Sequence, residues 1–153
     1  KDFRLMIIGG GGEEFKQKVI DTAKNLNILD KLVFVGQIPG SDLPKYLSCF
    51  DVGVAPSLTT SSWKEQFGRF TSEFILCGVP IIGSNSSTVD EVLKEDAIIY
   101  NERDADELAK KIEMLMKDPE IGKEQVRVGK KRVLAHHTNE KIAEKLVKFA
   151  KSL

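Results

Sequence analysis

Residues 52–84 contain the clearest secondary-structure pattern of the sequence: VGVAPSLTTSSWKEQFGRFTSEFILCGVPIIGS. A short apolar run, VGVAPS (52–57), is followed by a polar loop, by a helix expected over 68–77, and by a second apolar run, VPIIGS (79–84). Short apolar runs that end in Gly, Pro or Ser are typical of buried parallel strands. The segment therefore predicts two parallel strands joined by a helix.

The same alternation continues on both sides of this segment. Further strands are expected at 4–8, 32–36 and 97–100, and further helices at 13–26, 42–49 and 105–116. After Tyr100 the sequence is helical, with one break at 118–122, where Asp118 and Pro119 form a helix start. This order predicts an α/β fold with a Rossmann-like open parallel sheet, helices on both faces and a helical C-terminal segment. Ligands of such sheets bind outside the carboxyl ends of the strands.

Length and composition limit the class of protein. The 153 residues suit a single domain (1–153), which we divide into an alternating β/α core at 1–100 and C-terminal helices at 101–153. The 23 basic residues equal the 23 acidic ones, so no nucleic-acid partner is expected. Cys49 and Cys77 form no CxxC motif and lie in apolar segments, which predicts reduced core thiols and a cytoplasmic location.

Several familiar motifs are incomplete. GGGGEEF (9–15) follows a strand and precedes a helix, but it lacks the third glycine of a dinucleotide fingerprint, and no phosphate-loop lysine follows. Its glycines either let a ligand approach the backbone or form a flexible turn, and both interpretations stay open. His136 and His137 are adjacent without a third ligand nearby, so no metal site is expected. No serine or cysteine nucleophile with a neighbouring base is present.

An apolar stripe marks the last helix. Ile142, Leu146, Phe149 and Leu153 recur at spacings of four, three and four residues, which place them on one helical side. The stripe either packs on its own domain or docks a missing partner domain.

Two glutamates in residues 52–84 favour a ligand site. Glu65 precedes the expected helix and Glu73 lies on its second turn, so eight residues of helical rise separate them by about 12 Å. That span exceeds the separation of about 5–10 Å in glycosidase carboxylate pairs, but it suits acids that bind diols at opposite ends of an elongated ligand. Between them, the helix N-terminus and Gly68 favour a phosphate. A ligand with a diol at each end and a phosphate between them corresponds to a nucleotide sugar.

Each glutamate also has a simpler explanation. The helix dipole alone favours an acid such as Glu65 near a helix N-terminus. Glu73 interrupts an apolar run on the expected core side of the helix, where an unpartnered carboxylate is costly, so a ligand role is the better interpretation for it.

These residues resemble the nucleotide-binding half of the GT-B retaining glycosyltransferases of family 4. The family motif is Glu, seven residues and Glu, with Phe-Gly inside it and a Gly-x-Pro strand after it, as in 65–80. The likeness extends through LMIIGGGGEEF (5–15), through 26–57 and through IIYNERDADELAKKIEMLMKDPE (98–120), and thus covers most of the first 120 residues. The Glu pair alone is a weak signal, whereas the pair with its flanks is a strong one.

The resemblance implies roles for individual residues. Glu73 would hold the donor ribose, and Glu65 would act at the transferred sugar as the catalytic carboxylate. Backbone N–H groups of Phe67, Gly68 and Arg69 would face the sugar and the diphosphate, and Gln37 and Ile38 would lie near the base. Gly10 and Gly11 are further donor-binding candidates. The partner would be a nucleotide-diphosphate sugar, and neither a cofactor nor a metal is expected.

The sequence also departs from the family. The Arg and Lys that neutralise the diphosphate would precede 4–8, together with the first strand, its helix and an N-terminal acceptor domain. We therefore expect a fragment that cannot catalyse transfer by itself, and whose strands at 4–8 and 52–57 either pair directly or cause self-association. Ser87 stands where a glycine is common. Whether the longer protein binds a membrane surface is left open by the sequence.

Two other functions stay open at this point. One is a related nucleotide-sugar enzyme such as an epimerase, although such enzymes need further His and acidic residues in the cleft. The other is a non-catalytic nucleotide or sugar binding module, or an interaction domain. The base, the sugar and the acceptor are not specified by the sequence.

Overall fold

The computed structural model describes residues 2–66 and 68–152. Within it the chain forms two compact units, one up to Leu43 and the other from Pro44 onward.

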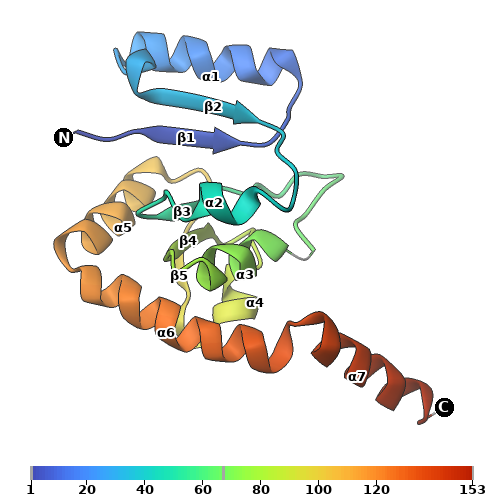
Figure 1. Cartoon of the computed structure of the whole chain (residues 1–153). Coiled ribbons are helices and arrows are strands. Elements are labelled where there is room, and N and C mark those ends of the chain that lie inside the picture. Colours follow the sequence, from blue (N-terminus) through green and yellow to red (C-terminus); the bar gives the residue numbers. More distant parts are fainter. Residues whose placement is uncertain (1, 67, 153) are drawn as a thin grey trace. The chain divides into compact units, whose positions relative to one another are not determined.

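The first unit is a strand–helix–strand unit (Figure 1). Strands β1 (Leu5–Ile8) and β2 (Leu32–Gly36) pair in parallel, with Leu5 opposite Leu32, and α1 (Glu13–Asn25) and the short 3-10 helix η1 (Leu29–Lys31) connect them. The Gly9 backbone N–H donates to the Gly36 carbonyl at 2.8 Å, which extends the pairing just beyond the strands. Both glycines have positive φ angles, of 121° and 77°, so a side chain at either position would strain the backbone.

The second unit contains a three-stranded parallel sheet in the order β3-β4-β5. Its strands are β3 (Gly53–Ala55), β4 (Ile81–Ser84) and β5 (Ile98–Tyr100). The helix α2 (Leu43–Leu47) begins at the boundary of the unit, and the remaining helices are α3 (Arg69–Leu76), α4 (Val89–Leu93), the 3-10 helix η2 (Lys94–Asp96), α5 (Ala105–Lys117), α6 (Pro119–His136) and α7 (Asn139–Ala150).

Side-chain caps set the starts of the last three helices. Asp104 accepts from the N–H of Glu107, and Asp118 accepts from the N–H of Glu120 beside Pro119, so the expected break at 118–122 is confirmed. Thr138 accepts in the same way from the N–H of Lys141. This third cap creates a second break, between α6 and α7, that the sequence interpretation lacked.

The core of the second unit lies around β4. All four residues of this strand are buried, and helices α3, α4 and α5 contact it. Ile82 packs with Ile98, Tyr100 and Leu115, while Ile75 of α3 and Val133 of α6 are fully buried. Burial raises the pKa of Tyr100 above its ordinary value.

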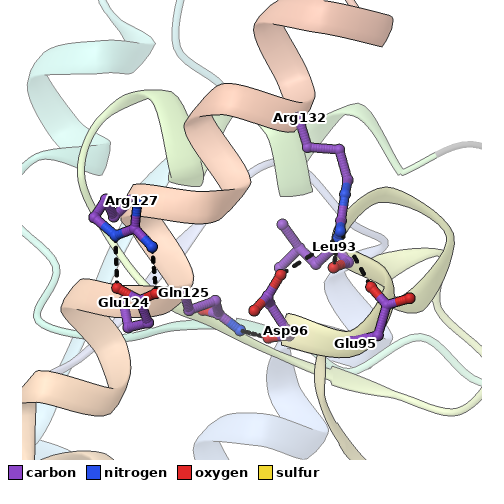
Figure 2. A network of polar contacts seen from close by, with 7 residues as sticks. All are labelled: Leu93, Glu95, Asp96, Glu124, Gln125, Arg127 and Arg132. Atoms are coloured by element: carbon purple, nitrogen blue, oxygen red, sulfur yellow. Dashed lines mark hydrogen bonds and ion pairs between the residues drawn. The ribbon is translucent and has the colours of Figure 1, made fainter.

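Polar contacts attach α6 to this core (Figure 2). The buried Gln125 side chain accepts from the Ile81 N–H at 2.8 Å and donates to the carbonyls of Ile81 and Asp96, at 3.1 and 3.0 Å. About two turns of helix further on, Arg132 donates to the Leu93 carbonyl and pairs with Glu95 and Asp96. The helix is thereby tied to both β4 and the α4–η2 segment.

The structure confirms the parallel α/β architecture and every predicted strand, and it corrects other expectations. Cys49 is exposed and Cys77 half-buried, so they are not core thiols, although both are free. Each lies on the outward side of its segment, a feature that a short apolar run does not reveal.

The described strands form one sheet in each unit, with the orders β1-β2 and β3-β4-β5. Both direct pairing of the strands at 4–8 and 52–57 and self-association stay predictions.

The stripe of the last helix is exposed as well. Helix α7 has no buried residue among those described, and Ile142, Leu146 and Phe149 are 39%, 63% and 64% exposed. Within the second unit, α7 continues past the end of α6 and away from the strands (Figure 1). The expectation that this stripe packs on its own domain is wrong for its described residues, because they are exposed and α7 contacts α6 to a small extent.

Replacement of Thr71 by Val should stabilise the protein. The Thr71 side chain is fully buried in α3, and its hydroxyl has no hydrogen-bond partner. Thr71→Val keeps the shape and removes the unsatisfied hydroxyl, so we expect the free energy of unfolding to rise by about 1 kcal/mol in a urea titration. Thr22→Val, at an exposed site in α1, is the control and should change it by less than about 0.5 kcal/mol. A destabilised Thr71→Val protein would contradict the prediction.

Candidate functional site

The loop between β3 and α3 carries the first of the two glutamates. It leaves the carboxyl end of β3 at Pro56, and the Thr60 N–H closes a turn on the Trp63 carbonyl at 2.9 Å. Glu65 follows this turn and is half-buried. Because the loop lies at the carboxyl end of a parallel strand, Glu65 occupies the place where ligands of such sheets bind.

Helix α3 begins directly after this loop. Gly68 is its N-cap residue, with Arg69 at the first helical position, in agreement with the expected start. The Thr71 N–H donates to the Gly68 carbonyl at 3.0 Å. Helix geometry leaves the N–H groups of Arg69 and Phe70 without intrahelical acceptors, so this end of α3 carries a partial positive charge that favours an anion. Arg69 is exposed and adds a full positive charge.

Glu73 lies on the second turn of α3, as expected, but not on its core stripe. That stripe is formed by Thr71, Phe74 and Ile75, which are buried at a helical spacing of three and four residues. Glu73 borders the stripe and is half-buried. The sequence interpretation placed it on the core side because its neighbours are apolar, whereas the helix turns its carboxylate toward partial solvent.

A cluster of buried hydroxyls after β4 was missed by the sequence interpretation. Ser84, Ser86, Ser87 and Thr88 are all less than about a tenth exposed. Ser84 donates to the Ser57 carbonyl at 2.6 Å, Ser86 shares a 2.6 Å hydrogen bond with Thr59, and Thr88 accepts from the Gly68 N–H at 2.7 Å. The only sequence signal was the run SNSST (84–88), which reads as an ordinary turn.

The end of β5 supports the same loop. The Thr59 N–H donates to the Glu102 carboxylate at 2.7 Å, and the Glu102 N–H donates to the Asn85 side chain at 2.9 Å. The Asn85 N–H in turn donates to the Tyr100 carbonyl. The carboxyl ends of β3, β4 and β5 are thus joined by one network of hydrogen bonds.

The first unit holds the other residues that the sequence singled out. Gly10 and Gly11 follow β1 and are exposed, while Gln37 and Ile38 follow β2. A Cβ atom at Gly10 would lie 3.0 Å from the Gln37 amide nitrogen, so the two loops meet at the carboxyl ends of their strands. At Gly11 a Cβ would meet no atom within 4 Å, so packing does not account for that glycine.

The structure therefore assembles the predicted residues into two groups. Glu65, Gly68, Arg69 and Glu73 lie on one loop and helix of the second unit, and Gly10 lies against Gln37 in the first. The prediction for Phe67 falls outside the described residues. His136 and His137 lie at the C-terminal end of α6, where burial, followed by the charge of Lys145, lowers the pKa of His137.

Among residues 2–66 and 68–152, no group of three or more His, Cys, Asp or Glu side chains is close enough to hold a metal ion. None of the described helices combines the length and the apolar character that a membrane crossing requires.

Comparison with known proteins identifies a family for this chain and enzymes that are similar to it. The profile of the family described as "Glycosyl transferases group 1" matches residues 1–134. N-acetyl-alpha-D-glucosaminyl L-malate synthase of Bacillus anthracis is 27% identical over 143 residues, which cover 92% of this chain and 35% of that enzyme.

Solved structures share the fold. Sucrose-phosphate synthase from Thermosynechococcus elongatus superposes with a TM-score of 0.83 at 26% identity, over 97% of this chain and 38% of the other. Anabaena HepE in complex with UDP-glucose gives 0.83 at 18% identity, over 98% and 41%. This chain thus spans 35% to 41% of the length of these three relatives.

Proposed function

Because the chain belongs to the group 1 glycosyl transferases, we propose that it is the donor-binding domain of a longer enzyme, which transfers a hexose from a nucleotide sugar with retention of configuration. The observation that carries this proposal is the β3–α3 junction, where Glu65, the N-terminus of α3 and Glu73 follow one another at the carboxyl end of a parallel strand. This junction lies inside the part of the chain that the family profile matches.

The geometry supports a division of roles along the donor. Half-buried Glu73 would accept hydrogen bonds from the two ribose hydroxyls, and Glu65 would act at the hydroxyls of the transferred sugar. The diphosphate would face the N-terminus of α3. Because the Gly68 N–H already donates to Thr88, the free N–H groups there would be those of Arg69 and Phe70.

The family resemblance also assigns ligand roles to residues of the first unit. Gln37 and Ile38 would contact a base mainly through the backbone, and Gly10 and Gly11 would allow close approach of a ligand. Positive charge from the helix terminus and from basic side chains would stabilise the leaving diphosphate, so the proposal includes no metal ion or cofactor. A cytoplasmic location and self-association of the chain stay predictions.

The alternatives lack a specific supporting observation. An epimerase would place histidines near the reacting sugar, but His136 and His137 end α6 instead of lining the β3–α3 loop. An interaction domain that binds no ligand would give no role to the half-buried Glu73 carboxylate.

A ligand-observed NMR titration tests the proposal. UDP, GDP, ADP and their common sugar conjugates are added in turn to the folded chain, and saturation transfer to the base and ribose is measured. We expect transfer to one nucleotide, which also identifies the base. A folded sample that gives no transfer to any member of this panel would contradict donor binding by this chain.

We expect the chain alone to catalyse no glycosyl transfer. This chain spans only 35% of the Bacillus anthracis enzyme and 38% of the sucrose-phosphate synthase, and positioning of both substrates contributes a large share of catalysis. Incubation with each nucleotide sugar and a panel of hydroxyl acceptors should release nucleoside diphosphate no faster than buffer does. Release that saturates with acceptor, and that disappears in a Glu65→Gln variant, would contradict this expectation.

A further inference from the structure

The hydroxyls after β4 bind the loop that carries Glu65 at both of its ends. Ser84 and Ser86 hold Ser57 and Thr59, just after β3, and Thr88 holds Gly68, just before α3. Within residues 84–88, Ser84, Ser86 and Thr88 thus each form one hydrogen bond with the loop. The part of the loop that contains Glu65 lies between two ends that are each held by these hydrogen bonds.

The contact made by Thr88 is the one closest to the proposed donor site. Thr88 is the N-cap residue of α4, a position where a threonine hydroxyl normally accepts from an N–H of its own helix. Its side chain makes no such capping bond and instead accepts from the Gly68 N–H at 2.7 Å. The side chain is 2% exposed, so water does not compete for this hydrogen bond.

Packing around Gly68 reinforces the contact. A Cβ atom at this position would lie 2.7 Å from the Thr88 hydroxyl oxygen and 2.7 Å from the Phe70 ring, so only glycine permits the close approach. The carbonyl of the same residue accepts from the Thr71 N–H in the first turn of α3. Both backbone polar groups of Gly68 are therefore committed, and the start of α3 is fixed relative to the loop.

We propose that Thr88 is a positioning residue of the donor site, whose hydroxyl holds Gly68 so that Glu65, the N-terminus of α3 and Glu73 keep the spacing that binds a nucleotide sugar. Thr88 acts through Gly68 and does not itself contact the ligand. This inference rests on the proposed function. It goes beyond it by assigning a role to a residue outside the motif that defines the family resemblance.

The first test needs no ligand. Hydrogen exchange of the Gly68 amide is measured by NMR in the wild-type chain, in Thr88→Val, which keeps the side-chain shape, and in Thr88→Ser, which keeps the hydroxyl. Exchange should be at least about tenfold faster in Thr88→Val and close to wild type in Thr88→Ser, because a lost hydrogen bond exposes the amide. Equal protection of the Gly68 amide in all three proteins would show that the Thr88 hydroxyl does not hold Gly68.

The second test uses the nucleotide identified by the titration above. Thr88→Val should lower the affinity for this nucleotide about tenfold, because the loss of one hydrogen bond leaves the binding loop less preorganised. Thr88→Ser keeps the hydroxyl and should restore the affinity. Thr71→Val is the matched control: it removes a buried hydroxyl that makes no hydrogen bond, and it should leave the affinity unchanged. If Thr88→Val proves unfolded, Thr88→Cys replaces the hydroxyl by a weaker acceptor of similar size.

The possible results separate the two proposals. Wild-type affinity in a Thr88→Val protein with a rapidly exchanging Gly68 amide would overturn the positioning role and leave donor binding intact. Absence of nucleotide binding by the wild-type chain, with Gly68 protection still dependent on the hydroxyl, would overturn donor binding and with it the positioning role, although the contact itself would remain.

Discussion

Replacement of Gln125 by Leu should lower the free energy of unfolding by about 3–5 kcal/mol. The Gln125 amide forms hydrogen bonds with three backbone groups, namely the N–H and the carbonyl of Ile81 and the carbonyl of Asp96, and Gln125 is 3% exposed. Figure 2 shows the contact with Asp96. Leu fills a similar volume but leaves these groups buried without partners. Because domains are stable by only about 5–15 kcal/mol, the loss removes a large part of the total.

Urea unfolding followed by circular dichroism measures this effect, and two further variants define its cause. Gln125→Glu can accept from the Ile81 N–H but cannot donate to the two carbonyls, so it should also be destabilised. Arg127→Ala, on the same helix, removes an exposed pair with Glu124 and should leave the midpoint almost unchanged. A Gln125→Leu protein as stable as Arg127→Ala would show that α6 is held by its apolar contacts alone.

The predictable part of the fold comes from local patterns. The strands at 32–36 and 79–84 were recognised because their apolar runs are short and end in turn residues, and the start of α6 was recognised from Asp118 and Pro119. Helix α4 was not predicted because it directly follows the run SNSST (84–88), which is typical of a turn.

The features that were not predictable depend on contacts between distant residues. Gln125 lies 44 positions from Ile81, and Thr88 lies 20 positions from Gly68, so neither hydrogen bond leaves a periodic signal in the sequence. The exposure of Cys49 depends on the side of its segment that faces solvent. At the site, spacing alone placed Glu65 before α3 and Glu73 on its second turn, whereas the buried hydroxyls that hold this loop looked like surface turn residues.

Replacement of Glu73 by Ala should weaken nucleotide binding about a hundredfold, or abolish it in the titration. Two ribose hydroxyls would donate to this carboxylate, and each hydrogen bond to a charged group contributes about 1.5–3 kcal/mol, so their joint loss corresponds to at least two orders of magnitude in affinity. Glu73→Gln keeps one good acceptor and the side-chain shape, and it should cost about tenfold.

The fold should survive both substitutions, because Glu73 borders the core stripe of α3 and is only half-buried. Circular dichroism and the unfolding midpoint check this point. Glu120→Ala, which removes an exposed acid whose partner is Lys123 on the same helix, is the matched control and should bind nucleotide as wild type does. If Glu73→Ala binds with unchanged affinity, the carboxylate does not contact the ribose. The nucleotide would then lie elsewhere on the carboxyl ends of the strands, and the assignment of Glu65 to the transferred sugar would lose its basis, because both roles depend on one donor stretched across the N-terminus of α3.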